Sequence, residues 1–119
     1  MRIIDFHTHF DDRWFDQPLL SEQAFIEGLD RCGIEFACVF TLMGLYENCR
    51  AHNDELASRA ARHPDRLLPF ITVDPKLGNP AIDELERCIA TGKFRGMTCA
   101  TMTSKIRVSF PARRDSIRG

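Results

Sequence analysis

Apolar and polar residues alternate along the chain in blocks that predict strands and helices in turn. Short apolar runs begin near residues 2, 35, 67 and 94, and read RIIDF, EFACVFT, RLLPFITV and KFRGMTC. Between them lie SEQAFIEGLDRCG, NDELASRAARHPD and AIDELERCIATG, in which apolar residues recur at helical spacing. Near-continuous apolar runs of this length favour buried strands, and the intervening periodicity favours helices with one apolar face.

Capping residues predict where the three helices begin and end. Ser21 and Asn53 are suited to cap the first two helices, because their side chains can accept from the free N–H groups of a first turn. Gly33 and Gly92 stand where a helix end favours a positive φ, and Pro64 marks the stop of the second helix. The residues expected to face the core are Phe25, Ile26, Leu29 and Cys32, then Leu56, Ala57, Ala60 and Ala61, then Ile82, Leu85 and Ile89.

The order of elements predicts a parallel sheet covered by helices. The strand starts give units of about 33, 32 and 27 residues, which is the βαβ pattern. A doubly wound open sheet and a (β/α)₈ barrel both fit, but the glycine-rich phosphate-binding loops of nucleotide-binding sheets are absent. A barrel needs about 250 residues. We therefore expect an incomplete (β/α)₈ TIM barrel of about three βα units plus a fourth strand.

Composition is that of a soluble globular protein, with 44% hydrophobic and 28% charged residues and a net charge of −1. No apolar stretch approaches the ~18 residues of a membrane span, and the N-terminus lacks a signal-peptide pattern. We expect a cytoplasmic protein without a membrane partner. The five cysteines show no CxxC spacing, which argues against a disulfide framework and favours reduced, buried thiols.

Charge divides the chain into two parts. Residues 1–98 carry 11 basic and 16 acidic side chains, whereas residues 99–119 carry five basic and one acidic. A basic tail can contact nucleic acid, but this one lacks interleaved aromatic residues, and we expect no nucleic-acid partner. We interpret 1–98 as the N-terminal portion of a barrel and 99–119 as a tail that is non-native or disordered.

The stretch IDFHTH suggests a metal site. Strand alternation would place Asp5, His7 and His9 on one face, at the strand end where barrel enzymes carry their active sites. Residues i and i+2 lie roughly 6.6 Å apart, so two imidazoles can converge on one ion. Zinc is the first expectation, with iron, manganese and nickel as alternatives. Such an ion makes hydroxide available by lowering the pKa of bound water.

At this point the chain resembles a known family. IIDFHTHF, GIEFACVFT, AARHPDRLLPFITVDP and FRGM together resemble the amidohydrolase-related (amidohydrolase 2) family, over about residues 2–97. The resemblance implies a metal-dependent TIM barrel that hydrolyses or decarboxylates a small organic substrate. In it, His7 and His9 match metal ligands and Asp5 the acidic residue before them. TatD-type nucleases and histidinol-phosphatase-type phosphoesterases open similarly but match HPDRLLPFITVDP less well.

The resemblance also implies residues that the chain lacks. A later ligand histidine and a late general-base aspartate have no counterpart, so no catalytic residue is assigned. Asp11 or Asp12 could supplement the two histidines, since a catalytic zinc uses three protein ligands plus water. We expect a truncated, inactive fragment. The alternative is a non-catalytic α/β domain that binds metal or a partner.

Other polar residues receive structural or peripheral roles. Arg13 and Trp14 follow the first strand, where a complete enzyme would place a substrate loop, although a Trp-Phe pair more often packs against the following helix. His52 is expected in a solvated loop and His63 at a helix end. Four strands of an unclosed barrel leave two bare edges, which predicts association between copies.

Overall fold

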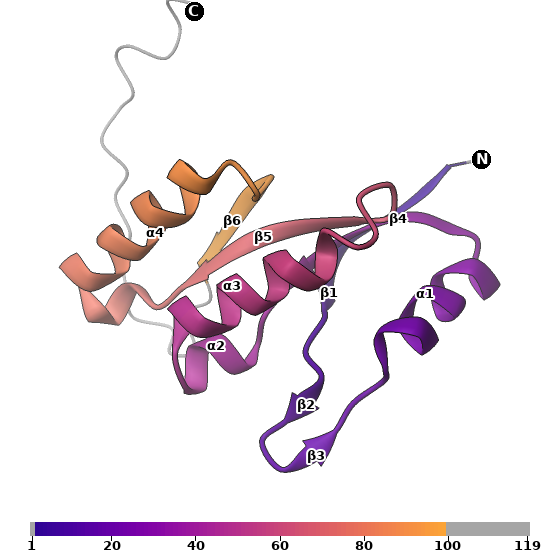
Figure 1. The fold of residues 1–119 in the computed structure, drawn as a ribbon, viewed down its shortest axis with the longest axis horizontal. Helices are drawn as coiled ribbons and strands as arrows, with labels where there is room; N and C mark the ends of the chain where they lie inside the picture. Colours follow the sequence, from indigo (N-terminus) through magenta and orange to yellow (C-terminus); the bar gives the residue numbers. More distant parts are fainter. Residues whose placement is uncertain (1, 100–119) are drawn as a thin grey trace, which may run out of the picture.

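The computed structural model describes residues 2–99, and the basic tail beyond them lies outside the described part (Figure 1). Four main strands are present: β1 (Ile3–His9), β4 (Ile34–Phe40), β5 (Leu67–Val73) and β6 (Gly96–Cys99). Three helices separate them: α1 (Glu22–Arg31), α3 (Cys49–Ala60) and α4 (Asn79–Thr91). The connections hold the hairpin β2 (Arg13–Trp14) and β3 (Gln17–Pro18), the short helix α2 (Met43–Tyr46), and a 3₁₀ turn η1 (Pro75–Leu77).

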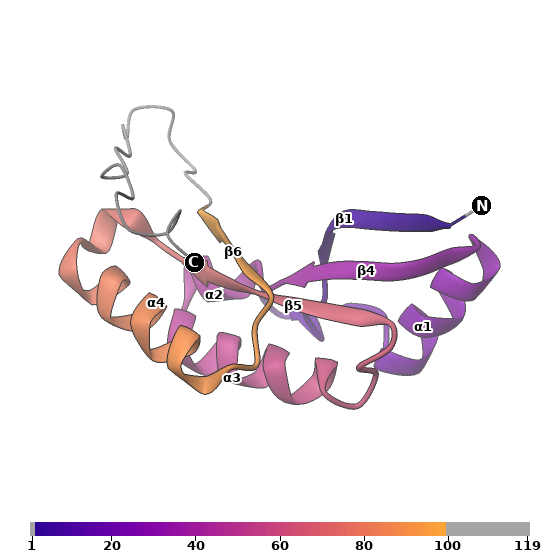
Figure 2. The ribbon, with the colours of Figure 1, turned by 90° about the horizontal axis from the view of Figure 1, so that it is seen from above.

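The main strands form one curled parallel sheet in the order β1-β4-β5-β6. All three long helices lie on the same side of it, and within residues 2–99 the opposite side carries no helix (Figure 2). Sequential strands are neighbours, as right-handed βα units in a barrel wall require. The predicted fold class, an incomplete TIM barrel, is confirmed.

Two apolar clusters join the helices to the sheet. One lies beneath α1 and α3, and the other beneath α4. The first contains Phe10, Leu29, Ala37, Val39, Leu56, Ala60 and Leu67, and the second Ile71, Val73, Ala81 and Cys88. Because alternate strand residues share a face, Phe40 and Phe70 point to the helix-free side, where their rings lie 5.1 Å apart.

Most predicted helix ends are confirmed, with one correction. The Ser21 hydroxyl accepts from Ala24 N–H, and Gly33 and Gly92 have φ of 69° and 68°. The second helix, however, begins four residues before the predicted cap, and the capping side chain is Asn48. Asn53 is instead fully buried within α3. An asparagine can cap a helix or lie within it and bond a neighbouring element, and the sequence pattern alone did not separate these two roles.

The inward face of α4 also differs from the prediction. Ala81 and Cys88 are buried and Leu85 packs partly against the core, but Ile82 and Ile89 are 53% and 63% exposed. These residues form one apolar stripe of α4, and Ile82 and Ile89 lie at the edge of the stripe that is turned away from the sheet. Ala61 of the second helix also differs from the prediction, because it lies on the exposed side after α3 ends.

The cysteines follow the expectation in part. Cys38 and Cys88 are buried, Cys49 is half-buried and Cys32 is exposed at the end of α1, and these four thiols are free. Burial is the main cause that raises the pKa of the Cys88 thiol to about 12, and its hydrogen bond to Glu84 raises it further. Cys88 is therefore a neutral packing residue, as a buried thiol usually is.

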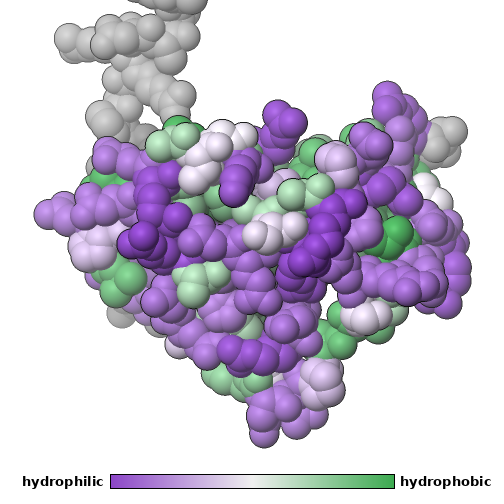
Figure 3. Space-filling model, in the orientation of Figure 1, coloured by the Kyte–Doolittle hydropathy of each residue, from purple (hydrophilic) through white to green (hydrophobic). Residues whose placement is uncertain are grey.

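The helix-covered face is mainly hydrophilic, with separate apolar patches (Figure 3). No helix within residues 2–99 has the length and apolar character needed to cross a membrane.

Candidate functional site

The two histidines of the HxH stretch lie together at the end of β1, on the helix-free side of the sheet. The ring of His7 is 5.1 Å from that of His9, in an edge-to-face arrangement, and 4.7 Å from that of Phe40. Both histidines are exposed, and neither ring makes a hydrogen bond to another described residue. The sequence prediction that they share a face is consistent with this geometry.

Asp5 does not share a face with His7 and His9, which corrects the prediction that strand alternation places all three on one side. The register between β1 and β4 slips between Asp5 and Thr8, because Asp5 lies opposite Ala37 and Thr8 opposite Val39. Three residues of β1 therefore span two of β4, as in a β-bulge. The Asp5 carboxylate accepts from the N–H of His7 at 3.0 Å and from the Thr8 hydroxyl at 3.3 Å. Its role is to hold the backbone that carries His7.

Two contacts fix the end of β1 just beyond the histidines. The N–H of Phe10 donates to the Phe40 carbonyl at 3.0 Å, and the guanidinium of Arg59 donates to the Phe10 carbonyl at 2.8 Å. Arg59 also lies over the Phe10 ring, 4.3 Å from its centroid. Arg59 is only 9% exposed, so this carbonyl and this ring face compensate much of the cost of burying its charge.

Asp11 joins the loop after β1 to the loop after β4. Its carboxylate is 8% exposed and accepts from the Thr41 hydroxyl at 2.7 Å and from Leu42 N–H at 2.8 Å. The Thr41 oxygen in turn accepts from Gly44 N–H at 3.1 Å, which holds the first turn of α2. Both Asp11 oxygens are therefore engaged, whereas Asp12 is exposed and contributes its carbonyl to the N–H of Leu19.

The predicted substrate-loop residues are tied to α2 rather than left free. Arg13 donates to the Phe15 carbonyl at 2.9 Å and to Glu47 at 2.5 Å. The Trp14 ring contacts the rings of Phe15 and Tyr46 at 4.7 and 5.3 Å. The aromatic contacts of Trp14 are thus with its neighbour Phe15 and with Tyr46 of α2, whereas the sequence favoured packing against the helix that follows.

The remaining histidines lie away from the HxH pair. His52 belongs to α3 and not to a solvated loop, and its Nε2 is 3.1 Å from Glu47. His63 stands just after α3, as predicted, and its Nε2 is 2.8 Å from Glu22 at the start of α1. It joins two helices and takes no part in the site.

The electrostatics around His9 favour its neutral imidazole. Partial burial is the main cause that lowers the pKa of His9, and the neighbouring His7 lowers it further, against an opposing effect of Asp11. A neutral ring nitrogen is the form that binds a metal ion. On a tetrahedral zinc with bonds of about 2.0–2.1 Å, two imidazole centroids would lie roughly 5 Å apart. The observed 5.1 Å fits this arrangement.

The pair by itself would form only part of a metal-binding site. Within residues 2–99 no group of three or more histidine, cysteine, aspartate or glutamate side chains is arranged to hold a metal. The two imidazoles therefore fit a divalent ion in donor type and spacing, and any further protein ligand has to come from beyond this stretch.

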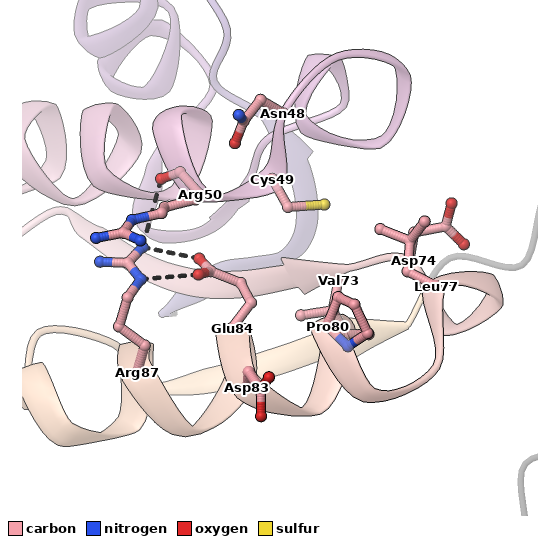
Figure 4. A pocket seen from close by; sticks show the side chains of 11 residues that line it. Asn48, Cys49, Arg50, Val73, Asp74, Leu77, Pro80, Asp83, Glu84 and Arg87 are labelled. Atoms are coloured by element: carbon pink, nitrogen blue, oxygen red, sulfur yellow. Dashed lines mark hydrogen bonds and ion pairs between the residues drawn. The ribbon is translucent and has the colours of Figure 1, made fainter.

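A separate hollow of about 330 Å³ lies between α3 and α4, away from the histidines (Figure 4). Cys49, Asp74, Glu84 and Arg87 are among the residues that line it. Glu84 and Arg87 pair with each other at 2.7 Å, and Glu84 also accepts from the Asn53 amide at 3.1 Å. These bonds close one end of the hollow.

Sequence reasoning missed three residues that position the site. Arg59 and Asn53 bond backbone groups of Phe10 and Thr72, whereas the Thr41 hydroxyl bonds the Asp11 carboxylate and Gly44 N–H. In the sequence Arg59 and Thr41 read as ordinary helix and strand-end residues, and Asn53 as a helix cap. The only signal was Arg59 and Asn53 falling at intervals of three from the apolar Leu56 of the same helix. That spacing places Asn53, Leu56 and Arg59 on the side of the helix that faces the sheet, where a buried polar side chain requires a hydrogen-bond partner.

Comparisons with known proteins agree with this architecture. The amidohydrolase family model matches residues 4–116. A Staphylococcus aureus protein described as an amidohydrolase superimposes with a TM-score of 0.65 at 24% identity, covering 82% of this chain and 36% of that one. The 2,6-dihydroxybenzoate decarboxylase from Rhizobium gives 0.65 at 23% identity, with coverages of 82% and 38%. No curated protein matches.

A third solved structure is an Acinetobacter baumannii protein described as a 2-pyrone-4,6-dicarboxylic acid hydrolase. Its TM-score is 0.56 at 21% identity, and the match covers 82% of this chain and 37% of that one. The chain thus spans less than two-fifths of the length of each of these structures. The superpositions establish the common fold, and the family match covers nearly the whole sequence. This chain belongs to the amidohydrolase family.

Proposed function

We propose that this chain forms the first part of a metal-dependent enzyme that hydrolyses a C–N or C–O bond of a small organic substrate, or decarboxylates it. The observation that carries the proposal is the pair of imidazoles, His7 and His9, whose ring centroids lie 5.1 Å apart on the helix-free side of a barrel wall. The family membership and the fold support it.

In this proposal His7 and His9 hold a divalent ion, with zinc expected first. The ion supplies Lewis-acid chemistry and activates water at neutral pH. Asp5 fixes the backbone of the pair, while Asp11 and Arg59 fix the strand end behind it. Phe40 and Phe70 provide an apolar wall beside the histidines, which suits a small organic substrate. Arg13 and Trp14 border the same strand end. We also propose a cytoplasmic location for the protein.

Turnover is assigned to a complete barrel. The described residues provide two ligands, where a catalytic zinc uses three protein ligands and a water. We therefore expect the 119-residue chain to bind metal weakly and to show no hydrolase or decarboxylase activity by itself. The names of the solved neighbours, a hydroxybenzoate decarboxylase and a pyrone dicarboxylic acid hydrolase, make small ring-containing acids the first substrates to assay.

The test is a zinc titration of the purified chain, followed by calorimetry and elemental analysis. The chain has four histidines, which provide a matched control. In His7→Ala/His9→Ala we expect zinc affinity to fall at least about tenfold, since two of the ligands are lost. In His52→Ala/His63→Ala the affinity should stay at the level of the unmodified chain.

Equal affinity in all three proteins would contradict the proposed site and assign zinc binding to other groups such as the thiols. Equal loss in both variants would also contradict it, because the loss would then follow from unfolding rather than from His7 and His9. Repeating the titration with Mn²⁺, Fe²⁺ and Ni²⁺ ranks the metals. Circular dichroism of each variant confirms that the sheet is retained.

A further inference from the structure

The hairpin of β2 and β3 is attached to the end of α2 by two adjacent pairs of side chains. Arg13 donates to the Glu47 carboxylate at 2.5 Å, and the Trp14 ring lies 5.3 Å from the Tyr46 ring. Each pair is the sequence neighbour of the other, so a displacement of Glu47 also moves Tyr46 relative to Trp14. We call these four residues the hairpin contact.

A third element binds the same carboxylate. His52 lies near the start of α3, and its Nε2 is 3.1 Å from Oε1 of Glu47, the oxygen to which Arg13 also donates. The side chain of His52 is 14% exposed, whereas those of Arg13 and Glu47 are 40% and 41% exposed. His52 is therefore the enclosed member of this network. Histidine is also the residue type whose charge changes between about pH 5 and 8.

Negative charge predominates among the groups that face His52. They come from the ends of α2 and β1, from β2 and from α3 itself, and several of them line one small hollow together with the imidazole. The charged residues are Glu47 after α2, Asp11 and Asp12 after β1, Arg13 of β2, and Glu55 and Arg59 of α3. Carboxylates outnumber guanidinium groups in this set, so a positive charge on the imidazole finds more attraction than repulsion.

Glu47 stays ionised over the pH range in which histidines titrate. The hydrogen bond from Arg13 is the main cause that lowers the pKa of Glu47, and the hydrogen bond with His52 lowers it further, against the opposing effect of burial. Hydrogen bonds between charged partners are shorter and stronger than those between neutral ones. Protonation of the His52 ring therefore strengthens its bond to a carboxylate that already carries a charge.

We propose that His52 and Glu47 form a pH-dependent latch that holds the hairpin against α2. At pH 5.5 the charged imidazole fixes the Glu47 carboxylate to α3 and keeps Tyr46 against Trp14. At pH 8 the neutral imidazole holds the carboxylate less firmly, and the Trp14 ring is uncovered for more of the time. His52 and Glu47 are positioning residues in this arrangement. The importance of the hairpin for a substrate rests on the function proposed above, whereas the latch itself does not.

Acrylamide quenching of Trp14, the single tryptophan of the chain, tests the latch. We expect the quenching constant of the unmodified chain to be about twofold higher at pH 8 than at pH 5.5, a modest change because the network is partly exposed. His52→Gln keeps a hydrogen-bond donor but cannot gain a charge in this range. Its quenching constant should therefore be the same at both pH values.

The matched control is His63→Gln. His63 also bonds a glutamate, Glu22 at 2.8 Å, but this bond joins α1 to the end of α3 and takes no part in the hairpin contact. The pH dependence of this variant should equal that of the unmodified chain. A second variant, Glu47→Gln, removes the charge that binds Arg13 and His52, and we expect strong quenching at both pH values.

Three outcomes would overturn the proposal: quenching of the unmodified chain that does not change with pH, a pH dependence retained in His52→Gln, and a pH dependence lost in His63→Gln. Circular dichroism at both pH values confirms that each variant is folded. The quenching experiment needs no metal ion, so failure of the latch and failure of the zinc site are distinguishable.

Discussion

The side-chain amide of Asn53 binds both backbone groups of Thr72, in the manner of a neighbouring strand. Its nitrogen donates to the Thr72 carbonyl at 2.9 Å, and its oxygen accepts from the Thr72 N–H at 3.0 Å. Thr72 lies beyond the last β4–β5 pair, Val39 opposite Pro69. One helix side chain thus completes the hydrogen bonding of β5 where β4 no longer accompanies it, and both residues are fully buried.

Removing this amide should be costly. Asn53→Ala leaves the buried N–H and carbonyl of Thr72 without partners, and we expect the free energy of unfolding to fall by about 2–4 kcal/mol. Urea denaturation followed by circular dichroism measures the change. Asn79→Ala is the control, because Asn79 is exposed, and it should change stability by less than about 0.5 kcal/mol. A similar loss in both would contradict the role of Asn53.

Arg59 should matter more than an exposed arginine of the same helical region. Arg59→Met removes the hydrogen bond to the Phe10 carbonyl and the contact with its ring, and we expect a loss of about 2–3 kcal/mol. The side chain of Arg62 is 61% exposed and forms an ion pair with Glu22. Arg62→Met breaks only this pair, and we expect the free energy of unfolding to fall by under about 1 kcal/mol. The same urea experiment compares the two variants. Equal losses in the free energy of unfolding would contradict the special role of Arg59.

Glu84 should make stability depend on acid pH. Burial disfavours its charged form, but hydrogen bonds from Arg87, Asn53 and Cys88 outweigh this and lower its pKa from 4.5 to about 2. A carboxyl whose pKa is lower in the folded state stabilises the fold above its unfolded pKa, and that contribution is lost as pH falls from about 4.5 to 2.

The pH dependence is measured as the difference in unfolding free energy between the unmodified chain and Glu84→Gln. After allowance for solvent screening, we expect this difference to shrink by on the order of 2 kcal/mol between pH 6 and pH 3. Glu55→Gln, at an exposed carboxyl of α3, is measured beside it as the control for the loss of one negative charge. A constant difference for Glu84 would mean that its ion pair with Arg87 does not persist in solution.

The single tryptophan reports on the loop after β1. Tyr46→Ala removes one wall of the Trp14 environment, and we expect a red shift of the tryptophan emission with a stability loss of about 1 kcal/mol. An emission maximum that is unchanged in Tyr46→Ala, but shifted in Ile89→Ala near the end of α4, would place Trp14 elsewhere.

The free edge of β1 should favour association between copies. Ile3, Ile4 and Phe6 are 43%, 43% and 76% exposed there, and exposed apolar edge strands tend to pair. We expect the sedimentation profile of the chain to shift to larger species as concentration rises, and Phe6→Lys to reduce the shift. A monomer that persists over a hundredfold concentration range would refute this.

Local chemistry accounts for what could be predicted from the sequence. Gly33 and Gly92 end their helices because their backbone conformations favour glycine, and the four apolar runs became the four parallel strands. One apolar stripe of α4 has Ala81 and Cys88 at one edge and Ile82 and Ile89 at the other. Which edge faces the sheet depends on how closely the helix approaches it, and the small residues allow the closer approach. The displacement of Asp5 from the histidines depends on one bulge against β4, which no periodicity in β1 alone contains.

The groups that hold the end of β1 in place differ from the two side chains proposed to bind a metal there. Arg59, Asp11 and the Phe40 carbonyl secure the strand end, whereas the rings of His7 and His9 bear no hydrogen bond within the described structure. Substituting either histidine should therefore remove a proposed metal ligand with little change in folding. Such separation lets natural variation at the two positions alter reactivity while the scaffold persists, and it marks this edge of the sheet as a place where new activities can be engineered.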